Sequence, residues 1–304
     1  MTRIQRLLAA TDLSAPARHA AERAALVARE LGAGLDVLHV ISDSPVDRLR
    51  RLLAEAPADL EARVIADARG DVERLAELLR KIYHIEAHAD VASGELVAAI
   101  NDRAAAGHAD LVVLGARGAS FMRHLLLGST AERLVRRSDK PLLVVKQPPH
   151  DPYRRVLVAV DFSPSSLPSL ALARAVAPAA ELVVLNAYEV PFEDRLRSAG
   201  LGEDTLERYR TIARRQALQG MHSLLTEAGL EPGRIATIVR QGDPSSLVIE
   251  QEQERDCDLI VVGRHGESAL EAILLGSVTR HLLQESQGDV LVSLAPPLLD
   301  GRAG

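Results

Sequence analysis

The sequence predicts an α/β protein with two tandem, doubly wound, parallel five-stranded sheets of the Rossmann-like kind, each with strand order 3-2-1-4-5. Along the 304-residue chain, short apolar runs alternate with longer segments of helical spacing. Most of these runs are continuously apolar, which is typical of parallel strands buried on both faces of a sheet. The whole pattern then occurs a second time, so we expect two copies of one unit.

The two copies align with almost no change of spacing. Residues 7–14 read LLAATDLS and residues 156–163 read VLVAVDFS, at an offset of 149. Residues 110–135 match residues 258–283 at 11 of 26 positions, at an offset of 148, which is far more than unrelated segments share. A duplication followed by small insertions and deletions explains both offsets.

A proline-rich segment marks the boundary between the copies. Residues 147–153 read QPPHDPY and follow an apolar strand, which indicates a short, stiff linker. We therefore expect a first domain over 1–147, a linker over 148–153 and a second domain over 154–304. Two domains also suit the length, since a typical domain has roughly 150 residues.

The first half is expected to alternate strand and helix from its start. Strands are expected near residues 4–10, 35–41, 85–91, 110–114 and 142–146. Asp12 or Ser14 caps the first helix, which carries Pro16 in its first turn and stops at the glycines of 32–34. Helical spacing also covers residues 46–81, 95–106 and 131–137. The strand at 85–91 is the most polar, so we place it at the periphery.

The second half repeats this order. Its strands are expected near residues 155–160, 181–187, 234–240, 258–262 and 290–294. A long segment, 189–228, separates its second and third strands and corresponds to 42–83 in the first half. Each of these segments either folds over the functional site as a lid or serves only as a crossover helix.

The composition argues against several classes of protein. A net charge of −6 and an aromatic content of 2% argue against binding of duplex DNA and against stacking on single strands. Cys257 is the single cysteine, which excludes an intrachain disulfide and a zinc site with two thiolates. The chain has no run of about 18 apolar residues and no targeting segment, so we expect a cytoplasmic protein without a membrane span.

A glycine pattern, G-x2-G-x9-G-S, follows the fourth expected strand of each half, beginning at Gly115 and at Gly263. Glycines let the backbone turn sharply and let its N–H groups approach an anion. The final Gly-Ser pair opens a helix, whose N-terminal N–H groups and dipole suit phosphate oxygens. In such sheets ligands bind at the carboxyl ends of strands one and four, where the strand order reverses. Asp12 and Asp161 end the first strands, so each faces the crevice of its own half.

A purely structural explanation competes with phosphate binding. A glycine turn before a capped helix needs no ligand, and Ser129 with Glu132 has the form of a capping box. Asp12 and Asp161 can cap a helix, or they can accept a ribose hydroxyl or hold Mg²⁺ through water. Glu132 also repels phosphate, whereas the second copy has Arg280 there. The repeated spacing favours a nucleotide site, because a cap does not require the first two glycines.

These motifs resemble the universal stress protein family over nearly the whole chain, as two tandem units. Each half has A-x-D-x-S after its first strand and the glycine pattern after its fourth. The resemblance is to the ATP-binding branch of the family, and it implies that the two aspartates lie in nucleotide sites. It also implies a main-chain contact to adenine from Val40, within Leu38-His39-Val40. Ala187 has this position in the second half, where packing against adenine would be poorer.

The expected nucleotide-binding residues of the first half are Asp12, Val40, Gly115, Arg117, Gly118, Gly128, Ser129 and Thr130. Those of the second half are Asp161, Ala187, Gly263, Arg264, Gly266, Gly276, Ser277 and Val278. Arg117 and Arg264 are equally consistent with solvated loop arginines. The expected ligand is ATP, with AMP or ADP as alternatives and with Mg²⁺ left open; we expect no catalytic residue and no protein-bound metal site.

The predicted function is an adenine-nucleotide-binding regulatory protein of the stress response, which switches with its ligand and acts on an unidentified protein partner. The alternatives are a slow ATPase or an ATP-dependent adenylating enzyme, and a scaffold with vestigial sites. The chain has neither a Walker A lysine motif nor an adenylating signature, so we expect weak ATP hydrolysis at most.

The resemblance also makes a prediction about assembly. Single units of the family pair through their last strands, which implies that residues 142–146 and 290–294 lie side by side. Both segments are apolar, and an uncovered apolar edge strand invites pairing. We therefore expect an internal pseudo-dimer and leave a further homodimer open.

Overall fold

The computed structural model describes residues 3–42, 60–118, 127–231, 233, 235–264 and 275–294. Strands of the first half are β1 (Arg6–Thr11), β2 (Gly34–Ser42), β3 (Ala87–Gly94), β4 (Leu111–Gly115) and β5 (Leu142–Val145). Its helices are α1 (Ala15–Leu31), α3 (Leu60–Tyr83), α4 (Leu96–Ala106) and α5 (Ser129–Arg137).

The second half repeats this arrangement. Its strands are β6 (Arg155–Ala159), β7 (Glu181–Tyr188), β8 (Ala236–Gln241), β9 (Leu259–Gly263) and β10 (Asp289–Ser293). Its helices are α6 (Ser166–Val176), α7 (Glu193–Ser198), α8 (Glu203–Glu227), α9 (Pro244–Glu254) and α10 (Ser277–Glu285).

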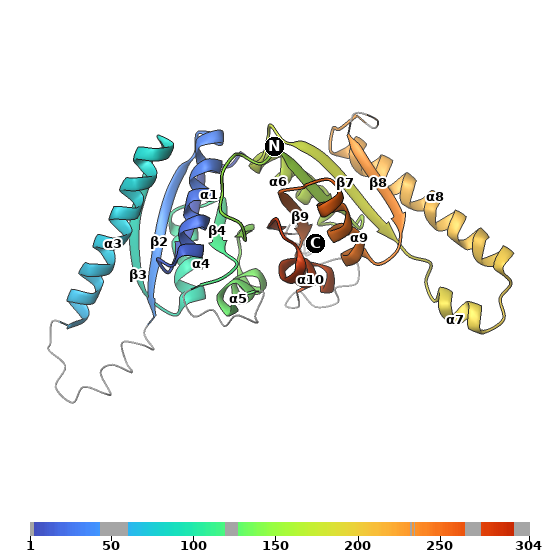
Figure 1. The fold of residues 1–304 in the computed structure, drawn as a ribbon, viewed down its shortest axis with the longest axis horizontal. Coiled ribbons are helices and arrows are strands. Elements are labelled where there is room, and N and C mark those ends of the chain that lie inside the picture. Colours follow the sequence, from blue (N-terminus) through green and yellow to red (C-terminus); the bar gives the residue numbers. More distant parts are fainter. Residues whose placement is uncertain are drawn as a thin grey trace, which may run out of the picture.

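These strands form one continuous sheet in the order β3-β2-β1-β4-β5-β10-β9-β6-β7-β8 (Figure 1). Within each half the neighbouring strands are parallel and follow the expected order 3-2-1-4-5. The halves join where β5 and β10 pair antiparallel, with Val144 opposite Val290. The predicted side-by-side placement of 142–146 and 290–294 is therefore confirmed, and it merges the two sheets into one.

Helices cover both faces of the sheet. One apolar layer contains buried residues of α1, α3, α6 and α8, and the other contains buried residues of α4, α5, α9 and α10. Both layers run across the two halves, since each includes core residues of β5 and β10. This burial on both faces explains why the strands are continuously apolar in sequence.

The first helix illustrates how local sequence sets the element boundaries. The Ser14 hydroxyl accepts from the amide of Ala17, Pro16 lies in the first turn, and Gly32 ends the helix with a φ of 62°. The buried face of α1 is largely alanine, which lets the helix pack closely on the sheet. Both ends of α1 therefore agree with the boundaries predicted from the sequence.

Other boundaries differ from the prediction. The strand β3 runs from Ala87 to Gly94 and lies at one edge of the sheet, whereas the sequence placed it at 85–91. The helix expected over 46–81 is seen as α3 from Leu60, and residues 43–59 lie outside the described part of the chain. Helix α5 begins at Ser129, as the Gly-Ser pair indicated, two residues before the start given by helical spacing.

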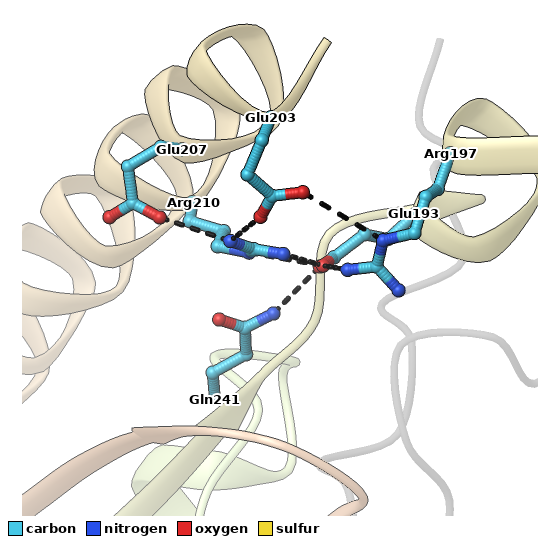
Figure 2. A network of polar contacts seen from close by, with 6 residues as sticks. All are labelled: Glu193, Arg197, Glu203, Glu207, Arg210 and Gln241. Carbon is cyan, nitrogen blue, oxygen red and sulfur yellow. Dashed lines mark hydrogen bonds and ion pairs between the residues drawn. The ribbon is translucent and has the colours of Figure 1, made fainter. Parts of the chain in front are cut away.

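Figure 2 shows the polar network that fixes α7 beside α8 in the second half. The Arg210 guanidinium donates to Glu193 on α7 and to Glu203 and Glu207 on its own helix. Glu193 also accepts from the side-chain amide of Gln241 at the end of β8, at 2.8 Å. These contacts hold α7 at the carboxyl ends of β7 and β8, and they lower the pKa of Glu193, mainly through the hydrogen bond from Arg210.

A buried polar cluster lies at the junction of the two halves. Asp289, at the start of β10, is 2% exposed and accepts from the Tyr153 hydroxyl at 2.7 Å and the Lys146 amide at 2.8 Å. The Arg23 guanidinium lies 3.3 Å from the Asp289 carboxylate and 4.2 Å from the centre of the Tyr153 ring. Two residues of the first half and one of the connecting segment therefore meet at a buried carboxylate of the second half.

Lys146 links the junction to α10. Its ammonium group donates to the carbonyl oxygens of Leu282 and Ser286, at 3.1 and 2.7 Å, and to the Ser286 hydroxyl. A cation at the carboxyl end of a helix is favourable, because the last carbonyls have no partner within the helix. Burial nevertheless lowers the pKa of Lys146 from 10.5 to about 8, against the opposing effect of Glu252 and Asp289.

This shift predicts how stability changes with pH. Between about pH 8 and 10.5 the unfolded chain binds a proton at Lys146 that the native protein has lost, so, against the opposite contribution of the buried Cys257 thiol above about pH 9, Lys146 contributes a rise of the unfolding free energy with pH in this window. Lys146→Met should remove this contribution, while Lys81→Met, at a side chain 71% exposed, should not. Denaturant unfolding at pH 7.5, 9 and 10 measures the slopes. Equal slopes in wild type and Lys146→Met would contradict the assignment.

Candidate functional site

Each half has a cavity at the carboxyl ends of its first and fourth strands, where the chain turns to opposite faces of the sheet. The first cavity has a volume of about 350 Å³ and lies at β1 and β4. The second has a volume of about 360 Å³ and lies at β6 and β9. This is the position at which doubly wound sheets bind ligands.

All eight residues expected to bind nucleotide in the first half line the first cavity. They are Asp12, Val40, Gly115, Arg117, Gly118, Gly128, Ser129 and Thr130. The apolar part of the wall comes mainly from buried side chains, including Leu38, Ile100 and Leu114. One side of the cavity is therefore apolar, and the other presents loop backbone, a carboxylate and the start of a helix.

A tight turn fixes the aspartate at the end of β1. Asp12 accepts from the amide of Ser14 at 3.0 Å and from the Ser14 hydroxyl, while Leu13 between them has a φ of 64°. The left-handed conformation is uncommon for a leucine and is strained. The amide of Leu13 donates to the Thr11 hydroxyl at 3.0 Å, which helps to hold this conformation.

The glycine loop packs directly against this aspartate. A Cβ atom added to Gly118 would lie 2.6 Å from Asp12 Oδ2, and one added to Gly115 would lie 3.1 Å from the Pro16 carbonyl oxygen. Gly128 closes the loop, since its amide donates to the Ala116 carbonyl at 2.8 Å. Glycine at these positions therefore lets the loop pack closely against Asp12 and the start of α1.

Helix α5 opens without a side-chain cap, which corrects the expected capping box. Gly128 is the N-cap residue, so Ser129 lies in the first helical turn instead of capping it. Glu132 accepts from Arg136 at 3.0 Å, one turn further along the helix, and this partly neutralises its charge. The first N–H groups of α5 therefore face the cavity without a serine cap, as an anion site requires.

The second cavity has the same plan with different side chains. Six of the expected residues line it: Asp161, Ala187, Gly263, Gly276, Ser277 and Val278. Asp161 accepts from the amide of Ser163 at 3.0 Å and from the Ser166 hydroxyl at 3.2 Å. Gly266, the expected counterpart of Gly118, lies outside the described residues.

Arg264 does not line the second cavity. Its guanidinium crosses to the first half and donates to the carbonyl oxygens of Arg136 and Ser138 at the carboxyl end of α5. Burial lowers the pKa of Arg264 in this position. Arg264 therefore contacts the other half of the chain instead of the expected phosphate position. At the offset of 148, Arg264 aligns with the buried Ala116 of the first half and not with Arg117.

The second half has Leu185-Asn186-Ala187 in place of Leu38-His39-Val40, yet an equivalent hydrogen bond is present in both halves. His39 Nδ1 donates to the carbonyl oxygen of Thr11 at 2.8 Å, and Asn186 Nδ2 donates to that of Val160 at 2.9 Å. In both halves the bond ties the second strand to the end of the first, beside the aspartate. Ala187 lines its cavity where Val40 lines the first.

Some lining residues were not anticipated from the sequence. Leu96 and Ile100 of α4, and Pro244 and Val248 of α9, form corresponding walls of the two cavities. The sequence feature that could have identified these residues is their spacing of four at the start of a helix, which places both side chains on one face. In the second half, Ser166 and Glu189 also line the cavity, where the first half has Ala17 and Ser42.

Fold and cavities together define a tandem, doubly wound α/β protein with a candidate phosphate-binding helix start in each half. The family model described as the universal stress protein family matches residues 3–146 and 152–293. The chain belongs to the universal stress protein family, in the form of two tandem units.

Individual relatives agree with this assignment. A universal stress protein of Mycobacterium tuberculosis is 30% identical over 196 residues, covering 61% of this chain and 59% of the relative. The chain thus matches about three fifths of the length of such curated relatives. A crystal structure of a universal stress protein from Archaeoglobus fulgidus has a TM-score of 0.69 at 21% identity, covering 97% of this chain and 98% of that one.

A further structure, a functionally unknown protein of Pseudomonas aeruginosa, has a TM-score of 0.64 at 20% identity, with 96% and 93% of the two chains covered. These two similarities establish the fold of the whole tandem chain. None of the helices in the described part of the chain combines the length and apolar character that a membrane crossing requires.

Proposed function

We propose that this protein binds one adenine nucleotide in each half and acts in the cytoplasm as a nucleotide-responsive regulator of a protein partner. One observation carries the proposal: each half brings an aspartate and an uncapped Gly-Ser helix start to the same cavity. The cavities also have an apolar wall, which suits a nucleobase. The two halves act as domains joined through the segment 148–153.

The parts of the first cavity divide between the parts of the ligand. The apolar wall with Val40 takes the base, with the backbone at the end of β2 as its polar contact. Asp12 accepts a ribose hydroxyl or holds Mg²⁺ through water. The amides of Gly118, Ser129 and Thr130 take the phosphate oxygens, because groups in loops and first helical turns have no helical partner.

The same arrangement argues for binding in preference to efficient catalysis. Phosphoryl transfer requires an oriented nucleophile and neutralisation of charge at the transferred group, usually by a metal and a cation. Arg117 is the cation among the described residues that line the first cavity, and Arg264 of the second half is engaged with α5. We expect ATP turnover far below the ~1–100 per second of typical kinases.

Limited proteolysis tests the regulatory part of the proposal. Arg195 and Arg197 on α7 offer trypsin sites near the carboxyl ends of β7 and β8, in the segment that follows Glu189 of the second cavity. Saturating Mg²⁺-ATP should slow cleavage there, because a ligand favours the conformer that it binds better. Phosphate release is measured in parallel. Unchanged cleavage at saturating ATP would contradict the switch, and sustained turnover of about 1 per second would favour an enzyme.

A further inference from the structure

The turn that holds the second aspartate lacks a contact that holds the first. Phe162 follows Asp161 with a φ of 64°, the same conformation that Leu13 adopts after Asp12. In the first half the Thr11 hydroxyl accepts from the amide of Leu13. The corresponding residue in the second half is Val160, which has no hydroxyl. A strained aromatic residue persists in this conformation only where its surroundings hold it.

The Phe162 ring lies against the bare backbone of a glycine inside α8. A Cβ atom added to Gly220 would lie 2.8, 2.9 and 3.1 Å from Cε2, Cδ2 and Cζ of that ring. Cβ atoms do not approach other atoms so closely, so the ring occupies the space where any side chain at this position would begin. Gly220 lies well within the helix Glu203–Glu227, where glycine is otherwise unfavourable.

The first half fills the corresponding space differently. The buried residues Val72 and Ala76 of α3 and Ala217 and Met221 of α8 are both spaced by four, so the two helices align at an offset of 145. Gly220 then corresponds to Leu75. Leu13 packs on the apolar cluster that contains Leu75, whereas Phe162 meets a glycine. The larger residue in the turn is thus matched by the smaller one in the helix.

We infer that the contact between Phe162 and Gly220 positions Asp161, so that helix α8 sets the affinity of the second site. This inference rests on the proposed nucleotide binding. Phe162 is 37% exposed and does not line the cavity, so it acts through the neighbouring Asp161 and not on the ligand itself. Because α8 also holds α7 through Arg210, a movement of this helix pair would displace the aspartate turn.

The substitution Gly220→Ala distinguishes this inference from the alternative that Gly220 has no positioning role, because the two hypotheses predict opposite effects on stability. Without the contact, alanine inside a helix should raise the melting temperature by about 2–4 °C. With the contact, Gly220→Ala should lower the melting temperature and weaken ATP binding at the second site at least about tenfold. Affinity is measured by titration calorimetry with Mg²⁺-ATP in a chain carrying Gly118→Val, which disables the first site.

Two further variants complete the test. Phe162→Leu together with Gly220→Ala relieves the overlap and should restore much of the affinity and the melting temperature. Gly70→Ala is the matched control in α3, since its Cβ would meet only the flexible Arg74 side chain, at 3.5 Å; it should raise the melting temperature and leave binding unchanged. A higher melting temperature and unchanged affinity for Gly220→Ala would overturn the inference. If the Gly118→Val parent binds no ATP, the proposed second site fails, and the positioning role fails with it.

Discussion

Gly118→Val should abolish nucleotide binding in the first half while the second half still binds. A Cβ at this position would lie 2.6 Å from Asp12 Oδ2, and because Ser14 holds Oδ1 of the same carboxylate with two bonds, moving Oδ2 aside would disturb the turn. The two further carbons of valine would also keep phosphate oxygens away from the loop amides. We expect at least about a 100-fold loss of affinity, or about 2.7 kcal/mol.

The control for this variant is Gly202→Val. Gly202 precedes α8, has ordinary backbone angles, and a Cβ there would meet no atom within 4 Å. Gly202→Val should bind nucleotide at both sites with unchanged affinity. Calorimetric titration of both variants decides the matter: if Gly118→Val keeps two sites of wild-type affinity, the glycine loop of the first half does not contact the ligand.

Asp289→Ala should cost about 3–5 kcal/mol of unfolding free energy, the range found when one partner of a buried ion pair is removed. The substitution leaves the guanidinium of Arg23 buried and without its carboxylate, and it removes the acceptor of the Tyr153 hydroxyl. It also leaves the amide of Lys146, which lies just before the segment that connects the halves, without its acceptor. The junction of the two halves should therefore weaken first.

An exposed ion pair provides the comparison. Asp151 pairs with Arg154 on the surface, with side chains 58% and 76% exposed, so Asp151→Ala should cost no more than about 1 kcal/mol. Urea denaturation gives both free energies. A loss below about 1 kcal/mol for Asp289→Ala would show that the buried carboxylate contributes no more than a surface one and would contradict the role assigned to the cluster.

The sequence predicted the positions of residues best where the proposed binding role and the local backbone geometry require the same residue types. Glycines and aspartates at strand ends recur at fixed spacing in both halves, and their positions in a 3-2-1-4-5 sheet follow from topology alone. Six of the eight expected residues of the second half and all eight of the first accordingly line the cavities. Ser14, Pro16 and Gly32 set the ends of α1 through interactions within a few residues.

Contacts between distant segments were not predictable in this way. Arg264 lies within the glycine motif but donates to α5 of the other half, which only the pairing of β5 with β10 makes possible. The sequence of Ser129 to Glu132 satisfies the capping-box pattern, yet Gly128 takes the N-cap position because its amide is bound to Ala116. Local sequence patterns indicate which conformations a segment favours, and tertiary packing determines which of them it adopts.

Titration calorimetry of the unmodified chain with Mg²⁺-ATP measures whether each half binds one adenine nucleotide. We predict binding of two ATP molecules per chain, with unequal affinities because Ala187 and Glu189 in the second cavity replace Val40 and Ser42 of the first. The Gly118→Val chain should bind one. Absence of any binding at millimolar ATP, with AMP and ADP equally inert, would show that neither half is an adenine-nucleotide site.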